Sequence, residues 1–288
     1  MIGSVTRLAV LVLTVLATVP HQIGTDSAAS GGRFVTVTAG RLWVTDTGGS
    51  GVPIVLLHAA TGSTIMWRKQ VASFGAAGLR VIAYDRFGRG RSVLATTVRR
   101  SNPASDLQEL VRALDLPTFH LLGTAAGGGV ALEYAVSHGG TLRSLVVANS
   151  TLTVDAPDFE LLASHRLPPE FTNLPIDFRE LGATFRVSDP DGVRAWLDAV
   201  HGSEPVSAES PIAEDRQPLT WATVDRIVLP TLLIAGDSDW YAPLPIVRLF
   251  ASHVKTSRTV VMSEVGHSGY WEQPEKFNQS VIDFVTKH

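Results

Sequence analysis

The stretch from residue 118 to residue 134 constrains the fold of this chain more than any other part. It reads as a short apolar strand, a tight turn of small residues and the start of a helix, and the turn itself is Gly123-Thr124-Ala125-Ala126-Gly127. Strands that pass directly into helices are the building units of α/β proteins. The stretch therefore predicts an α/β fold, with this turn at the end of one strand.

The same alternation runs along most of the chain. After a hairpin of two strands, short apolar strands alternate with amphipathic helices, which is typical of a parallel sheet covered on both faces. The expected strands are 34–38, 41–45, 53–58, 79–85, 119–123, 142–149, 230–236 and 258–262, and the expected helices are 66–77, 103–114, 126–138, 243–253 and 274–287. The predicted fold class is α/β, with a mostly parallel eight-stranded sheet.

Composition sets the size of the fold and removes several classes of function. The chain has 288 residues, of which 45% are hydrophobic, enough for one large domain with a modest insertion. The net charge is -3, so no nucleic acid or anionic membrane surface is expected as a partner. There is no cysteine, which excludes disulfides, a thiolate nucleophile and cysteine-based metal sites. No cofactor or metal motif is present, so we expect neither a cofactor nor a metal.

The first 29 residues are expected to form a separate unit. Arg7 precedes an almost unbroken apolar run at 8–19, which is followed by Pro20 and small residues at 27–29. This is the layout of a secretory signal peptide, and the run is shorter than the roughly 20 residues that span a bilayer. We therefore predict an exported protein, periplasmic or extracellular, with no stable membrane span after processing. A single N-terminal anchor is the alternative.

One long stretch, residues 151–226, lacks any convincing strand. It contains helical patterns at 159–165, 176–186 and 191–200, separated by loops that contain proline. Ligands of open α/β sheets bind outside the carboxyl ends of the strands. We therefore interpret this stretch as a helical cap over that edge, and residues 30–150 and 227–288 as the core. A helical decoration without function is the alternative.

Several motifs, in the expected order, resemble the α/β-hydrolase superfamily over about residues 33–287. The turn at 123–127 resembles the nucleophile elbow, G-x-S-x-G. His58–Gly62 resembles the turn of the oxyanion hole, and Asp85–Ser92 resembles the D-x-x-G-x-G-x-S loop. Gly266-His267 resembles the loop that carries the catalytic histidine. The resemblance implies an α/β-hydrolase fold with a helical cap, and an enzyme of the hydrolase class.

The resemblance also assigns an acid and a base. His267 is the best general base in the chain. The acid of the family usually comes three residues after a glycine such as Gly236, which selects Asp239. Asp237 is the rival, with turn formation as its other interpretation. The chain order of elbow, acid and histidine is that of α/β-hydrolases.

Backbone amides supply the oxyanion hole that the resemblance implies. By position, its two donors are the N–H groups of Ala60 and Ala126. In this interpretation His58 braces the turn and is not a base.

The loop of residues 85–92 has two interpretations. Its glycines permit a tight turn, and Asp85 can accept hydrogen bonds from backbone N–H groups. We interpret the loop as structural, and a substrate contact by Arg86 or Arg89 is the less favoured alternative.

The nucleophile position of the elbow holds Ala125, and a methyl group cannot attack a carbonyl. Thr124 is adjacent, but its side chain is expected to point away from the elbow. An elbow aspartate is absent too, which excludes the epoxide-hydrolase and dehalogenase chemistry that uses one. Ala125 is either natural or a replacement of serine made to trap substrate. A leader segment without a purification tag favours the natural residue.

A His–Asp pair beside an oxyanion hole still provides a general base. We therefore predict an enzyme that acts on a small, mostly apolar ester, lactone or C–C bond substrate. Two alternatives stay open: a non-hydrolytic base catalyst of the lyase or cofactor-independent oxygenase type, and a ligand-binding pseudoenzyme. A small molecule is the expected partner, and the oligomeric state is left open. Candidate pocket residues, with core packing as their alternative role, are Trp67, Thr124, Trp240 and Tyr241.

Overall fold

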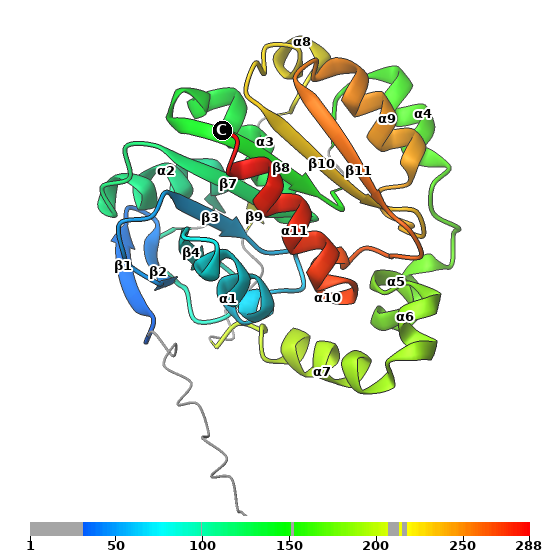
Figure 1. Ribbon diagram of the computed structural model, residues 1–288, viewed down its shortest axis with the longest axis horizontal. Helices are drawn as coiled ribbons and strands as arrows, with labels where there is room; N and C mark the ends of the chain where they lie inside the picture. The colour runs from blue at the N-terminus through cyan, green and yellow to red at the C-terminus, as the bar shows by residue number, and fades with distance from the viewer. Residues whose placement is uncertain (1–30, 99, 151–152, 207–212, 215–217) are drawn as a thin grey trace, which may run out of the picture.

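A central sheet runs through the protein and carries helices on both faces (Figure 1). The computed structural model describes residues 31–98, 100–150, 153–206, 213–214 and 218–288. The expected signal peptide, residues 1–29, lies outside these ranges. No helix within them is long and apolar enough to cross a membrane. The predicted α/β class is confirmed.

The sheet has nine strands, of which the shortest was not predicted. They are β1 (Arg33–Val37), β2 (Gly40–Asp46), β3 (Pro53–Leu57), β4 (Arg80–Tyr84), β5 (Val93–Leu94), β7 (Phe119–Thr124), β8 (Leu142–Ala148), β10 (Thr231–Gly236) and β11 (Ser257–Met262). The order is β1-β2-β4-β3-β7-β8-β10-β11, with β5 paired to β2. β2 is antiparallel to its neighbours β1 and β4, and the strands from β4 to β11 are parallel. β5 has only two residues, too few for a periodicity to reveal.

Each face of the sheet has its own apolar core. One face carries α1 (Arg68–Ala76), α10 (Gly269–Glu272) and α11 (Pro274–Val285), and the other carries α2 (Pro103–Ala113), α3 (Ala126–His138) and α9 (Leu244–His253). The position of strand β3 between the two cores explains why its sequence is apolar throughout. Ile54 and Leu56 lie in the core under α1, whereas Val55 and Leu57 lie in the core under α3. Alternate side chains of a strand point to opposite faces, so a strand covered on both sides is apolar at every position.

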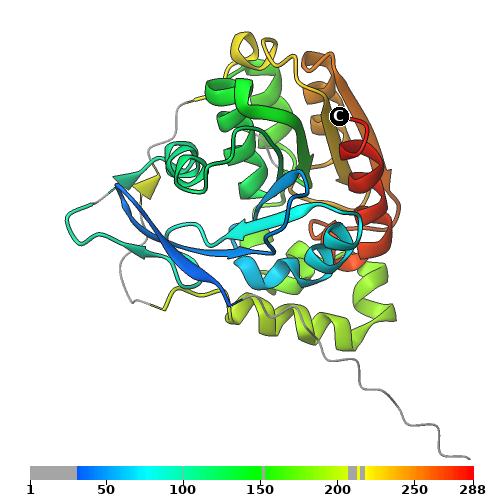
Figure 2. The same cartoon turned by 60° about the vertical axis from the view of Figure 1, so that its left-hand side comes forward.

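The insertion between β8 and β10 packs against the core at both of its ends. Its helices are α4 (Pro157–Ser164), α5 (Ile176–Glu180), α6 (Ala183–Ser188), α7 (Pro190–His201) and α8 (Trp221–Val224). α4 contacts α9, and α7 contacts the 3₁₀ helix η1 (Thr64–Trp67). In both views α7 runs along the edge of the molecule beneath α1 (Figures 1 and 2).

Two details of the insertion differ from the sequence expectation. The single helix expected at 176–186 is two helices, because the backbone is extended at Gly182. A Cβ on Gly182 would lie 2.7 Å from the carbonyl oxygen of Glu264, so this glycine allows two chain segments to meet closely. The stretch also contains a two-residue strand, β9 (Ala213–Glu214), which pairs with β6 (Arg100–Ser101).

Candidate active site

The turn between β7 and α3 adopts a strained conformation at the residue where the elbow nucleophile would stand. Ala125 has φ 49° and ψ −121°, which a residue with a Cβ rarely adopts. Its N–H donates to Ala148 O at 3.0 Å, and its carbonyl accepts from Gly128 N at 2.9 Å. The side chain is only 5% exposed. The elbow is therefore fully formed, with a methyl group in place of a hydroxyl.

The two elbow glycines explain how this conformation is held. A Cβ on Gly123 would lie 2.2 Å from Gly127 O, and a Cβ on Gly127 would lie 2.3 Å from Leu57 O. Strand β7, helix α3 and strand β3 thus approach each other more closely than any larger residue would permit. This packing aims the N-terminus of α3 at the carboxyl edge of the sheet.

His267 and Asp239 meet at that edge, from the loops after β11 and β10. His267 Nδ1 lies 2.8 Å from Asp239 Oδ2 and 2.9 Å from Oδ1. The N–H groups of Tyr241 and Ala242 donate to Asp239 Oδ1 at 2.8 and 3.1 Å. Both members of the pair are buried. Because the carboxylate accepts from Nδ1, the second ring nitrogen, Nε2, is the one available for chemistry.

Asp237, the rival acid, makes different contacts. Its carboxylate accepts from Glu264 N at 2.7 Å and from Ser263 Oγ at 3.0 Å. These bonds join the loop after β10 to the loop after β11. Asp237 therefore stabilises the turn, and Asp239 is the aspartate that the structure places against His267.

Asn149, which the sequence reasoning did not select, connects the two loops. Its side-chain amide donates to Asp239 Oδ2 at 3.3 Å and to Gly266 O at 2.9 Å. Asn149 has φ 44° and directly follows β8. A polar residue directly after the apolar run at 145–148 was the signal available in the sequence.

The His267–Asp239 pair is strongly coupled. Burial lowers the pKa of His267, but the Asp239 carboxylate outweighs it and raises that pKa to about 9. Burial likewise favours the neutral form of Asp239, but the charge and hydrogen bond of His267 hold the pKa of that carboxyl below its usual value. At neutral pH the two groups therefore form an ion pair.

Two buried glutamates contact the loop that carries His267, and the sequence analysis predicted neither of them. The Glu272 carboxylate accepts from the N–H groups of Gly182, Gly266 and Ser268 at 2.8, 3.0 and 3.2 Å. Burial raises the pKa of Glu272 to about 7. Glu180 accepts the His267 N–H at its backbone oxygen, 2.8 Å away. Burial raises the pKa of its carboxyl, which His267 partly opposes.

His58 is occupied at both ring nitrogens. Nε2 accepts from Arg86 N at 2.9 Å, and Nδ1 donates to Ala59 O at 2.7 Å. Burial holds the pKa of His58 well below its usual value. The neutral ring therefore braces the turn after β3 against the loop after β4.

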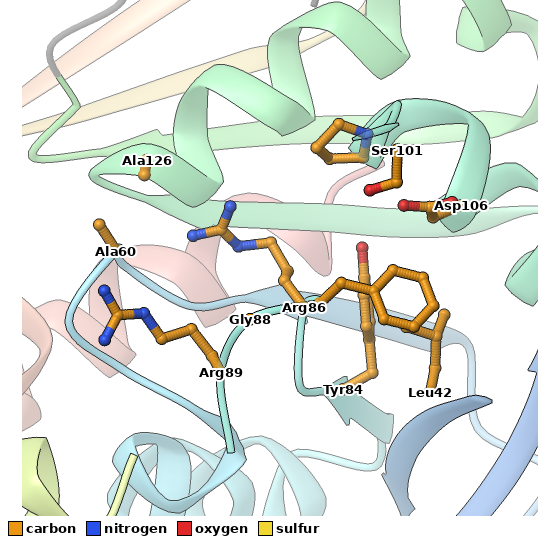
Figure 3. A pocket seen from close by; sticks show the side chains of 11 residues that line it. Leu42, Ala60, Tyr84, Arg86, Gly88, Arg89, Ser101, Asp106 and Ala126 are labelled. Carbon is orange, nitrogen blue, oxygen red and sulfur yellow. The ribbon is translucent and has the colours of Figure 1, made fainter. Parts of the chain in front are cut away.

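The turn after β3 and the N-terminus of α3 border one cavity. Ala60 and Ala126 line a cavity of about 280 Å³, together with the loop after β4 (Figure 3). The two residues predicted to donate N–H groups to an oxyanion thus share one space.

The four candidate pocket residues occupy different environments. Trp67 is fully buried, and its ring lies 5.1 Å from that of Tyr270 in the core beneath α1. Thr124 is fully buried at the end of β7. Trp240 is 53% exposed. The Tyr241 ring lies 4.5 Å from the His267 ring, so it is the one of the four whose ring packs on the histidine. Within the described ranges, no group of three or more His, Asp and Glu residues could hold a metal.

Comparisons with known proteins identify the family of this chain. The profile of the Alpha/beta hydrolase family matches residues 54–280. The chain therefore belongs to this family.

Particular relatives are hydrolases by name. A 2-hydroxy-6-oxononadienedioate/2-hydroxy-6-oxononatrienedioate hydrolase from Paraburkholderia xenovorans is 26% identical over 92% of this chain and 98% of its own. A pimeloyl-[acyl-carrier protein] methyl ester esterase from Aeromonas hydrophila is 28% identical over 82% of this chain and 96% of its own. A solved structure of a malate-bound thermophilic esterase from Thermogutta terrifontis has the same fold, with a TM-score of 0.74 at 23% identity over 89% of this chain and 98% of its own.

Proposed function

We propose that this protein is an enzyme of the hydrolase class that acts on a small ester, lactone or C–C bond substrate, with His267 as its general base. The observation that carries the proposal is the buried His267–Asp239 pair at the same edge of the sheet as an elbow that is complete except for a hydroxyl. The names of the relatives, which act on a carbon chain with a keto group and on a methyl ester, support the substrate classes.

The proposed reaction proceeds without an acyl-enzyme, because Ala125 offers no nucleophile. Neutral His267 removes a proton from a water molecule as that water attacks the substrate carbonyl. The N–H groups of Ala60 and Ala126 stabilise the negative oxygen that forms. The carbonyl re-forms as the leaving group departs, and the leaving group takes the proton from His267. General base catalysis of this kind contributes roughly a hundred- to ten-thousandfold in rate.

We propose that part of the insertion, predicted as a cap over residues 151–226, covers this site. The Phe171 ring lies 5.1 Å from the Tyr241 ring, and Glu180 bonds to the backbone of His267. These two contacts support a position of the segment from 171 to 182 over the proposed base. Export through residues 1–29 stays a prediction.

A second candidate function is base chemistry on the substrate itself, in which His267 removes a proton from the substrate and no water attacks. The methyl group of Ala125 favours it, because no enzyme nucleophile is present.

The test is the Ala125→Ser variant, assayed beside the parent on a panel of p-nitrophenyl esters and lactones and with a serine-reactive fluorophosphonate. A hydrolase site that lacks only its hydroxyl should gain ester hydrolysis and covalent labelling. The matched control is the double variant Ala125→Ser/His267→Ala, which should lose both because the serine is no longer activated.

The outcomes separate the candidates. Turnover of an ester or lactone by the parent, abolished by His267→Ala, supports the proposed hydrolysis. A folded Ala125→Ser protein that neither hydrolyses esters nor takes the label contradicts hydrolysis and points to base chemistry on the substrate itself. Tight binding of small molecules without turnover in either protein contradicts the proposal of an enzyme and indicates a ligand-binding protein.

A further inference from the structure

We propose that Arg86 and Arg89 form a carboxylate subsite next to the oxyanion hole, so that the substrate carries a free carboxylate. The inference deepens the proposed function and rests on it for the reaction. The subsite itself is defined by a cavity and by the charges that line it.

The cavity beside the oxyanion hole is small and has walls of mixed character. Its volume of about 280 Å³ lies near the lower end for ligand pockets, so it suits a short acid. Ala60 and Ala126 border it, and its apolar walls come from Leu42, Tyr84, Phe87 and Pro103. A ligand whose carbonyl lies against the amides of Ala60 and Ala126 can therefore extend one end of its chain into this cavity.

Charge is distributed unevenly along the cavity. The guanidinium groups of Arg86 and Arg89 lie at the end near Ala126 and Ala60, whereas Asp106 lies at the other end with Ser101 (Figure 3). The positive N-terminus of α3 adds to the cationic end. A carboxylate is therefore attracted to the oxyanion-hole end and repelled from the end with Asp106.

Arg89 is the group best suited to meet a ligand. Its side chain is half-buried against the cavity, and it makes no ion pair or side-chain hydrogen bond with any residue in the described ranges. Arg86 is 7% exposed and forms the inner wall. A planar guanidinium binds a carboxylate through two parallel hydrogen bonds, which a neutral amide of the same shape cannot match.

The loop that carries both arginines is held rigidly. Arg89 N donates to Arg86 O at 3.1 Å, and Arg86 N donates to His58 Nε2 at 2.9 Å. The Asp85 carboxylate accepts from Thr64 N at 2.6 Å and from Arg91 N at 2.8 Å. These bonds close a tight turn that places the side chains of residues 86 and 89 in one cavity. A preformed site loses less conformational entropy when a ligand binds.

The test measures binding directly, so that it does not depend on turnover. Isothermal titration of the parent with glutarate and with its neutral analogue glutaramide should give clear binding of glutarate and at least tenfold weaker binding of glutaramide. Arg89→Gln should weaken glutarate binding about tenfold or more and leave glutaramide unchanged. Arg89→Lys keeps the positive charge but cannot form the two parallel hydrogen bonds of a guanidinium. Its affinity for glutarate should therefore lie between those of the parent and of Arg89→Gln.

The matched control is Arg258→Gln, an exposed arginine near the start of β11, away from the carboxyl edge of the sheet. It should bind glutarate as the parent does. Circular dichroism melts of all variants establish that they are folded. Equal affinity of the parent for glutarate and glutaramide, or unchanged affinity in Arg89→Gln, overturns the subsite. Glutarate binding without turnover of any ester contradicts the proposed function only, and ester turnover without a carboxylate preference contradicts the subsite only.

Discussion

The charge state of His267 decides what this site can do. A general base must be neutral, yet the Asp239 carboxylate raises the pKa of His267 to about 9 despite burial. The pair stabilises the fold fully below the ordinary histidine pKa, and this stabilisation is lost as pH rises through about 9. The depressed pKa of Asp239 acts in the opposite pH direction, since its stabilisation is present above the ordinary aspartate value and is lost as the pH falls through the folded value.

We expect the activity of the parent to rise with pH until His267 loses its proton. The value of kcat/KM should increase about tenfold per pH unit from neutrality and level off near pH 9. Asp239→Asn should lower both the pKa and the plateau, because the amide neither stabilises the imidazolium nor favours the correct tautomer. A pH–rate profile of both proteins measures this, and an NMR titration of the His267 ring does so without a substrate. A His267 ring that titrates near 6 in the parent would contradict the prediction.

At the scale of the element, loops carry His267, Asp239 and the arginines. Two of these loops are each held by a buried carboxylate that accepts several backbone N–H bonds, which we call a clamp. The histidine loop is clamped by Glu272, whose carboxylate binds three backbone N–H groups from this loop and from Gly182 of the insertion. The loop after β4 is clamped in the same way by Asp85. Buried carboxylates that accept several N–H bonds thus hold irregular backbone in place where no sheet or helix can.

Removing the Glu272 clamp should be costly. In Glu272→Ala three buried N–H groups lose their acceptor, and we expect a loss of about 3 kcal/mol or more in the free energy of unfolding. Glu272→Gln keeps one acceptor oxygen and should cost less. Urea unfolding checks both, with Glu275→Gln as the control, because Glu275 is exposed in the next helix. An Ala variant as stable as the control would mean that the loop is held by other contacts.

At the scale of the whole molecule, the insertion is part of the core. Trp196 of α7 is fully buried, and Ala199 and Val200 join it in the core beneath α1. At the other end, α4 packs on α9. The insertion is therefore tied to both faces of the sheet, and its segment from 171 to 182 contacts Tyr241 and the backbone of His267.

Trp196→Ala should destabilise the entire domain. Deleting a fully buried aromatic side chain costs about 3–5 kcal/mol, and we expect it as one shift of the main unfolding transition. Val187→Ala, at an 83% exposed position of the preceding helix, should change stability by about 0.5 kcal/mol or less. A separate early transition in Trp196→Ala, seen by fluorescence while circular dichroism persists, would show that the insertion unfolds on its own.

Much of the fold was predictable because its signals are local. Strand β3 is apolar at every position because both of its faces are covered, and this pattern is visible without any partner. The Gly123–Gly127 turn is likewise encoded within five residues. The break at Gly182 was not predicted, and the close approach to the backbone of Glu264 that a side chain there would prevent joins segments far apart in the chain.

The sequence by itself determined the α/β class, the order of the motifs, and the absence of a hydroxyl at Ala125. Tertiary structure alone decided which groups meet. It placed Asp239 and not Asp237 against His267, added Asn149 and Glu272 to the site, and put two arginines in one cavity with Ala60 and Ala126. The physical reason is that propensity and periodicity act over neighbouring residues, whereas a site is made from the ends of strands that are adjacent in the sheet and distant in the chain.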